Sequence, residues 1–280
     1  MAAVVRSETF YAEVRGGRRF CILHQPDVGA VPRGAVVHVH AFAEEMNKSR
    51  RMVALAARAL AASGRAVLLL DLDGCGDSSG EFGEATWSRW TEDVEFAQRW
   101  ATERFGGACW LWGLRAGCLI VAEASARQGG RAPLLLWQPV LSGRLHLTQF
   151  LRLKLANEAL GGAEERTGVS AVRARLAQGA SVEIAGYMLG PLLATGLEQA
   201  ELSLESQLAP VVWREVSGAP EPSLASASQA RIDKLRARGV AVDAVAVSGA
   251  PFWQTIEIAE APMLVETTVA ALEAADACAG

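Results

Sequence analysis

The 280-residue sequence lacks several features that would place it in a specialised class of protein. No run approaches the roughly 18 uncharged apolar residues of a membrane-spanning helix. The charged segment 1–10 does not read as a signal peptide. The formal net charge is only −4, so no basic surface for nucleic acid is indicated. We therefore expect a cytoplasmic protein with no transmembrane segment and no nucleic-acid partner, and its oligomeric state stays open.

Cysteine is scarce and unpatterned. The five cysteines are odd in number and lack CxxC spacing, which indicates reduced thiols rather than a disulfide framework or a zinc site. They are Cys21, Cys75, Cys109, Cys118 and Cys278. The carboxylates of Glu44, Glu45, Asp71 and Asp73 follow no metal-site spacing, and the glycines of segment 71–80 are wrongly spaced for a dinucleotide. We expect neither a metal nor a cofactor.

What is present is an alternation of short apolar runs and helical patterns. This order predicts an α/β fold with a mostly parallel central sheet and helices on both faces. An antiparallel hairpin at 9–23, turning at Gly16-Gly17, precedes it. Parallel strands are expected at 34–40, 66–70, 108–112, 133–140, 210–216 and 240–247, and helices at 50–63, 86–104, 119–127, 226–239 and 262–277.

Residues 143–208 have a different character. They contain helical segments at 145–160 and 169–178 and no convincing strand before residue 210. We interpret this segment as a helical lid inserted into a core made of residues 1–142 and 209–280.

The segment Cys109-Trp-Leu-Trp-Gly-Leu-Arg-Ala-Gly-Cys-Leu-Ile120 reads as a strand, a tight turn and the start of a helix. It resembles the nucleophile elbow of the α/β-hydrolases, G-x-S-x-G, with Arg115 in place of the serine. A guanidinium has no nucleophilic oxygen or sulfur and stays protonated. Cys118 lies a helical turn too late to replace the nucleophile, and we interpret it and Cys75 as buried thiols.

Histidine is also missing where a hydrolase would need it. A serine nucleophile requires a base, which in α/β-hydrolases follows the acid late in the chain. The four histidines are His24, His38, His40 and His146, and the loop expected to carry the base reads Ala250-Pro-Phe-Trp253. Because nucleophile and base are missing at two independent places, the sequence predicts that no standard Ser-His-Asp triad is present.

The polar segment 42–51, expected to be a loop, lies where α/β-hydrolases supply an oxyanion-hole amide. It is either a solvated loop that caps the next helix through Asn47 or Ser49, or a partner for the elbow. In the second case Glu44 or Glu45 pairs with Arg115. Such a pair is purely structural, or it leaves Arg115 to bind a carboxylate or phosphate with a glutamate as base.

Arg115, Glu44 and Glu45 are thus the candidate catalytic residues. Further residues at expected strand ends are candidates for a substrate pocket. These are Phe42, Ala43, Asp73, Trp112, Leu114, Ala116, Gln138, Phe252 and Trp253. In the lid segment, Glu183, Tyr187 and Met188 either face this pocket or lie on a surface helix.

Several motifs together resemble one α/β-hydrolase family, named "hydrolase 2, exosortase A system-associated". They are Phe42-Ala-Glu-Glu-Met-Asn-Lys-Ser-Arg-Arg51, Asp71-Leu-Asp-Gly-Cys-Gly-Asp-Ser-Ser-Gly80, Trp112-Gly-Leu-Arg-Ala-Gly117, Glu183-Ile-Ala-Gly-Tyr187 and Pro251-Phe-Trp-Gln254. Ala41 departs from the expected proline. The resemblance implies the α/β-hydrolase fold, an arginine as the usual elbow residue, and a link to bacterial exopolysaccharide production.

Two functions follow as hypotheses. The first is a non-standard hydrolase or acyl-transfer enzyme acting on an acylated or saccharide-linked small molecule. The second is a catalytically inactive pseudoenzyme that binds a small ligand or a protein partner. The dense polar segment 42–51 favours the first, and the absence of both serine and histidine favours the second.

Overall fold

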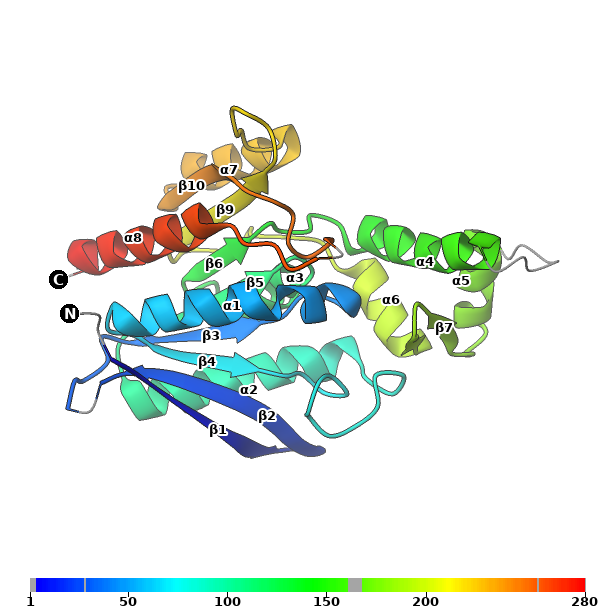
Figure 1. The fold of residues 1–280 in the computed structure, drawn as a ribbon, viewed down its shortest axis with the longest axis horizontal. Coiled ribbons are helices and arrows are strands. Elements are labelled where there is room, and N and C mark those ends of the chain that lie inside the picture. The colour runs from blue at the N-terminus through cyan, green and yellow to red at the C-terminus, as the bar shows by residue number, and fades with distance from the viewer. Residues whose placement is uncertain (1–3, 28, 161–167, 256, 280) are drawn as a thin grey trace.

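The computed structural model describes residues 4–27, 29–160, 168–255 and 257–279. Its strands are β1 (Val5–Val14), β2 (Gly17–Pro26), β3 (Ala35–Val39), β4 (Ala66–Leu70), β5 (Cys109–Leu114), β6 (Leu134–Trp137), β9 (Val211–Ser217) and β10 (Val242–Ser248). They form one sheet in the order β1-β2-β4-β3-β5-β6-β9-β10 (Figure 1). The six strands from β4 to β10 in this order are parallel, whereas β1 and β2 are antiparallel. The predicted mostly parallel sheet is confirmed.

Helices cover both faces of the sheet. The helices are α1 (Glu44–Ala62), α2 (Trp87–Phe105), α3 (Gly117–Arg127), α7 (Ser226–Ala237) and α8 (Pro262–Ala279). Because strand side chains alternate between faces, Val37 and Leu111 pack with α2 and α3, whereas Val36 and Trp110 pack with α1 and α8. The chain therefore has two apolar cores, one on each side of the sheet.

Helix α1 begins earlier than the sequence pattern indicated. Its first residue is Glu44, so most of segment 42–51 is helix rather than loop, and the expected N-caps Asn47 and Ser49 lie inside it. Two glutamates in the first turn favour this start, because their negative charges interact favourably with the positive end of the helix dipole. Ala43 precedes the helix with φ 50° and makes no side-chain cap. The expectation of a polar loop up to Ser49 was wrong.

Between β6 and β9 the chain forms α4 (Gly143–Leu160), α5 (Val169–Ala177), the hairpin β7 (Val182–Ile184) and β8 (Tyr187–Leu189), and α6 (Pro191–Gln199). The hairpin corrects the expectation that this segment has no strand. Its strands are only three residues long and give too few alternations to recognise. In Figure 1 these elements lie together beyond the end of the sheet. The division into a core and a 143–208 lid stays a prediction.

Within the described residues, no helix has the length and apolar character needed to cross a bilayer. Cys21, Cys75, Cys109 and Cys118 are free and buried, and the side chain of Cys278 lies outside the described part of the chain. No group of three or more potential ligands among the described side chains is arranged to hold a metal ion.

Candidate functional site

The turn between β5 and α3 keeps the backbone geometry of an elbow. Arg115 directly follows the strand and has φ 55°, a conformation that is uncommon for a residue other than glycine. A Cβ on Gly113 would lie 2.6 Å from the Cα of Cys118, and one on Gly117 would lie 2.4 Å from the carbonyl oxygen of Val39. Both flanking glycines are therefore required by close backbone approach, so the strained turn is retained although its central residue is arginine.

The guanidinium of Arg115 is paired with the carboxylate of Glu45, as one of the sequence hypotheses predicted. Its Nε and Nη2 donate to Oε1 of Glu45 at 3.2 and 3.1 Å, and Nε also approaches Oε2 at 3.4 Å. The two side chains are 13% and 18% exposed, so the pair is largely but not fully removed from water. Burial raises the pKa of Glu45, and the charge of Arg115 opposes that shift.

The carboxylate of Glu44 contacts Lys48 and Tyr187. Its carboxylate lies 4.0 Å from Nζ of Lys48 and accepts a hydrogen bond from the hydroxyl of Tyr187 at 3.5 Å. Tyr187 in turn accepts a hydrogen bond from Nδ2 of Asn47 at 2.8 Å. The hairpin β7–β8 is thus tied to the first turns of α1, and Tyr187 lies in a strand rather than on a surface helix.

The indole ring of Trp253 also contacts the guanidinium of Arg115. The Cζ atom of Arg115 lies 5.3 Å from the centroid of the Trp253 ring, within cation–π range. Trp253 belongs to the loop after β10, where an ordinary α/β-hydrolase is expected to carry its catalytic base. Among the described residues, Nη1 of Arg115 has no hydrogen-bond acceptor. One edge of the guanidinium is therefore still able to donate.

His146 also belongs to this group, although the sequence did not single it out. It lies in the first turn of α4, and its Nε2 is 3.9 Å from Oε2 of Glu45. Burial, with a contribution from Arg115, lowers the pKa of His146 to about 3, so the ring is neutral near pH 7. Its buried Nδ1 has no described partner. The position of His146 shortly after β6 could have identified it from the sequence, because the carboxyl ends of parallel strands meet at one edge of the sheet.

A cleft of about 310 Å³ opens above these residues. It is lined by Phe42, Glu44, Glu45, Lys48, His146, Gln149, Phe150, Leu153, Trp253 and Gln254. Arg115 contacts two of its walls, Glu45 and Trp253. The cleft therefore combines aromatic rings with carboxylates, amides and a lysine.

Two backbone N–H groups occupy the chain positions that form the oxyanion hole in α/β-hydrolases. They belong to Ala116, which follows the elbow residue, and to Phe42, in the turn between β3 and α1. Neither has a hydrogen-bond acceptor among the residues that the structure describes. Donors of this kind stabilise a developing negative charge on a carbonyl oxygen. Ala43, with its positive φ, shapes the same turn.

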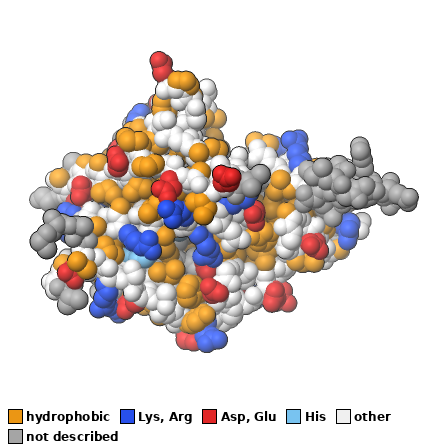
Figure 2. Space-filling model, in the orientation of Figure 1, with side chains coloured by type: hydrophobic (Ala, Val, Ile, Leu, Met, Phe, Trp, Pro, Cys, Tyr) orange, Lys and Arg blue, Asp and Glu red, His pale blue; other side chains and the backbone are white. Residues whose placement is uncertain are grey.

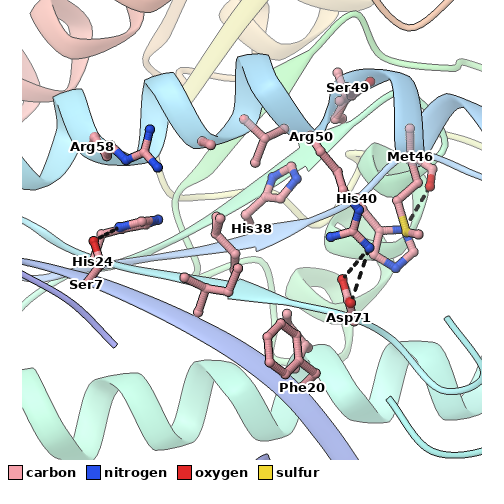
Figure 3. Close-up of a pocket in the computed structure, with 17 residues that line it drawn as sticks. Ser7, Phe20, His24, His38, His40, Met46, Ser49, Arg50, Arg58 and Asp71 are labelled. Atoms are coloured by element: carbon pink, nitrogen blue, oxygen red, sulfur yellow. Dashed lines mark hydrogen bonds and ion pairs between the residues drawn. The ribbon is translucent and has the colours of Figure 1, made fainter. Parts of the chain in front are cut away.

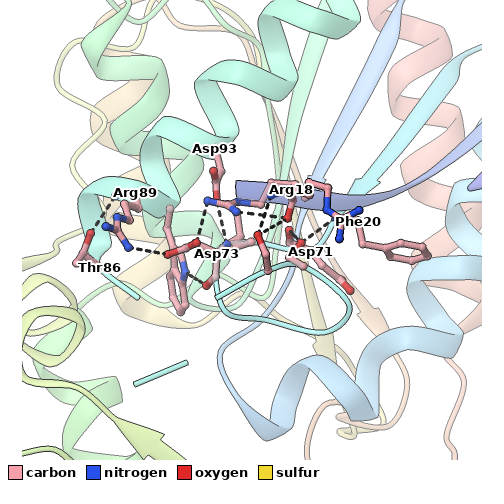
Figure 4. A network of polar contacts seen from close by, with 12 residues as sticks. Arg18, Phe20, Asp71, Asp73, Thr86, Arg89 and Asp93 are labelled. Carbon is pink, nitrogen blue, oxygen red and sulfur yellow. Dashed lines mark hydrogen bonds and ion pairs between the residues drawn. The ribbon is translucent and has the colours of Figure 1, made fainter. Parts of the chain in front are cut away.

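The remaining predicted pocket residues are not brought to the cleft lining. Asp73 is buried and pairs with Arg19 at 2.9 Å and with Arg89 at 3.4 Å, in a network that also contains Asp93 (Figure 4). Gln138 accepts a hydrogen bond from the backbone of Val216. Three others are fully buried beside α1 and α8: Trp112, Leu114 and Phe252.

The strand order and the strained turn define the α/β-hydrolase fold. The chain belongs to the family described as serine aminopeptidase, S33, whose profile matches residues 30–186. No curated protein sequence matches the chain at a significant level.

Solved structures share the fold at low sequence identity. Est1E from Butyrivibrio proteoclasticus, with bound ferulic acid, has a TM-score of 0.66 and 15% identity, covering 94% of this chain and 97% of its own. A carboxyl esterase from Bacillus coagulans has a TM-score of 0.62 and 14% identity, and the match covers 96% of this chain and 98% of the esterase. A soluble variant of monoglyceride lipase from Saccharomyces cerevisiae has a TM-score of 0.61 and 15% identity, and the match covers 96% of this chain and 94% of the lipase. Identities this low establish the common fold alone.

Proposed function

We propose that this hydrolase-family protein uses its cleft to bind a neutral, saccharide-linked small molecule, without a Ser-His-Asp triad. The observation that carries the proposal is the pairing of Arg115 with both Glu45 and Trp253. This pairing converts the nucleophile position into a fixed hydrogen-bonding group beside an aromatic ring.

The charge balance of the cleft favours a neutral ligand over an anion. Glu44 and Glu45 are matched by Lys48 and Arg115, so the side chains around the cleft carry no net charge. A carboxylate or phosphate ligand would compete with Glu45 for the same guanidinium. Hydroxyl groups of a sugar, in contrast, are able to accept from Nη1 of Arg115 and donate to the glutamates.

The aromatic walls support the same class of ligand. Phe42 packs edge-to-face against Phe150, with ring centroids 5.1 Å apart, and Trp253 also lines the cleft. Apolar rings with a few convergent polar groups are typical of small-molecule sites. The motif resemblance to exosortase-associated hydrolases supports a role in exopolysaccharide production in the cytoplasm, which is part of the proposal.

The test is a binding titration with neutral sugars, acylated sugars and their carboxylated counterparts, followed by calorimetry. We expect neutral sugars to bind, and we expect Arg115→Lys to weaken their binding about tenfold. Lysine keeps the positive charge but lacks the planar set of N–H donors of the guanidinium. Arg51→Ala is the matched control, since Arg51 is exposed and pairs with Glu260 away from the cleft. Tighter binding of the carboxylated sugars would contradict the proposal.

A second candidate is hydrolysis by direct attack of water on a bound ester. It is favoured by the free N–H groups of Ala116 and Phe42 and by the nearby bases Glu45 and His146. In this reaction the water oxygen bonds to the acyl carbon of the ester and a base takes the water proton. The bond between the acyl carbon and the alkoxy oxygen then breaks, and the base passes the proton to the leaving alkoxide, which gives a carboxylic acid and an alcohol. Turnover of p-nitrophenyl esters that Glu45→Gln abolishes, with no labelling by a fluorophosphonate, would establish it.

A further inference from the structure

A second cavity, of about 290 Å³, lies between α1 and the sheet. It is distinct from the cleft, because the two share no lining residue. Its floor is formed by β2, β3 and β4, and one side of α1 forms its roof (Figure 3). We call it the α1 cavity. Nothing in the site described above uses it.

Most of the α1 cavity is apolar. Its walls include Ile22, Val53, Ala54, Leu69 and Leu70. Ile22, Ala54 and Leu69 are only half-buried, so the cavity reaches the surface along the junction of α1 with β2 and β4. A ligand with an apolar chain would gain by removing these side chains from water.

One buried ring nitrogen on the floor has no hydrogen-bond partner among the described residues. His38 is 3% exposed, and its Nδ1 has no hydrogen-bond acceptor or donor among the described residues. Its ring packs on Trp112, with centroids 4.3 Å apart. The neighbouring His40 differs, because its Nδ1 bonds to the carbonyl of Ala41 and its Nε2 accepts from the N–H of Leu72. His38 therefore still has hydrogen-bonding capacity, which is costly to bury unused.

The rim carries an excess of positive charge. Arg50 and Arg58 both line the α1 cavity, and Asp71 is its single carboxylate. Asp71 lies 3.3 Å from Arg50, whereas Arg58 has no ion-pair partner in the described part of the chain. Figure 3 shows Arg58 projecting from α1 over His24, and burial, with a contribution from Arg58, lowers the pKa of His24. Figure 2 shows blue side chains beside pale-blue histidine surface on this face.

We propose that the α1 cavity binds a medium-chain carboxylate, with the carboxylate at Arg58 and the acyl chain along Ile22, Val53 and Leu69. The unpaired guanidinium is suited to a carboxylate, which it contacts through two parallel hydrogen bonds. The apolar walls are suited to the chain, and His38 offers a further hydrogen bond inside the cavity. This site differs from the cleft in charge: the cleft is balanced, whereas the α1 cavity favours an anion.

The test compares decanoate with decanol by calorimetry, because the two share a chain and differ in charge. We expect decanoate to bind about tenfold more tightly, and Arg58→Ala to remove that difference. Arg51→Ala, on the same helix but outside the cavity, should bind decanoate as the unaltered protein does. Ala54→Phe, which adds a ring to the cavity wall, should weaken both ligands.

A further arm separates the α1 cavity from the cleft. Arg115→Met alters the cleft and leaves the cavity lining unchanged, so decanoate affinity should not change. If Arg115→Met weakens decanoate and Arg58→Ala does not, the anion occupies the cleft and the proposal is overturned. It is also overturned if decanoate does not bind, or if it binds Arg58→Ala as tightly as the unaltered protein. Arg58 is exposed and makes no ion pair with any residue that the structure describes, so its replacement should leave the fold intact, which circular dichroism checks.

Discussion

The guanidinium of Arg115 and the carboxylate of Glu45 lie 3.1 Å apart, although the two residues are separated by 70 positions in the chain. The contact joins the elbow to the first turn of α1. A guanidinium brought to the end of a buried strand loses hydration, and a carboxylate facing it offsets that cost. The pairing explains how an arginine is tolerated on a strained turn that elsewhere in the superfamily carries a small serine.

We expect a double-mutant cycle to detect a favourable interaction energy between Arg115 and Glu45. Arg115→Met leaves the Glu45 carboxylate without its partner and should lower the free energy of unfolding by about 2 to 3 kcal/mol, less than for a fully buried pair because both side chains are partly exposed. Adding Glu45→Gln should restore about 1 kcal/mol or more. Urea unfolding of the four proteins measures both values. Additive effects would show that the contact contributes nothing to stability.

Restoring a serine at the elbow should not create an esterase. In Arg115→Ser the hydroxyl would lie beside the free N–H groups of Ala116 and Phe42, but Trp253 lies in the loop that carries the base of ordinary hydrolases. We expect p-nitrophenyl acetate turnover no higher than that of the unaltered protein. A large gain that His146→Ala removes would instead identify His146 as a base able to reach residue 115.

The sequence was sufficient to predict the sheet and the elbow, and it offered the pairing of Arg115 with Glu44 or Glu45 as one of two interpretations of segment 42–51. These features depend on local patterns: apolar strands, the two glycines of the turn, and adjacent carboxylates. It was insufficient for the start of α1, because Ala43 is not a recognisable N-cap, and for the hairpin β7–β8, whose strands are too short. His146 was missed because only the folded chain brings the first turn of α4 against Glu45.

Acid should destabilise the protein in part through His146. Its pKa falls from an ordinary 6.5 in the unfolded chain to about 3 in the folded one. Below pH 6.5 the unfolded state therefore binds a proton that the folded state does not, and stability is lost as pH falls from 6.5 toward 3. This single group contributes a slope of about 1.4 kcal/mol per pH unit.

His146→Gln should reduce this slope by the contribution of one proton, as measured by urea unfolding between pH 7 and pH 4. Because His24, His38 and His40 also have lowered pKa values, some acid sensitivity should persist. Gln149→Ala is the control, since Gln149 lines the same cleft and does not titrate. An unchanged slope in His146→Gln would show that His146 is accessible to protons in the folded state.

The buried ion network beneath the glycine-rich segment should matter for stability. Arg19 is 1% exposed and pairs with both Asp73, at 2.9 Å, and Asp93, at 2.8 Å. Arg19→Met leaves the buried carboxylate of Asp93 without its ion-pair partner and leaves Asp73 with only its 3.4 Å contact to the exposed Arg89, so we expect a loss of about 3 to 5 kcal/mol. Arg89→Ala, which removes a 54%-exposed partner of the same Asp73, should cost less than about 1 kcal/mol. Equal losses in the two variants would contradict this account.

Substitutions of Trp253 should distinguish its contribution to ligand binding in the cleft from its contribution to the stability of the protein. The ring lies against both Arg115 and Phe252, and it lines the cleft beside Glu45. Trp253→Ala removes the aromatic wall and the cation–π contact together, and the contact alone is worth about 1 kcal/mol. Trp253→Phe keeps a ring and should retain most of the binding of a neutral sugar, whereas Trp253→Ala should weaken it about tenfold. Calorimetry on both variants, with unfolding followed in parallel, distinguishes the two effects. Sugar affinity that is the same in Trp253→Ala as in Trp253→Phe would mean that the ring does not contact the ligand, and the aromatic wall would then act only to hold Arg115 against Glu45.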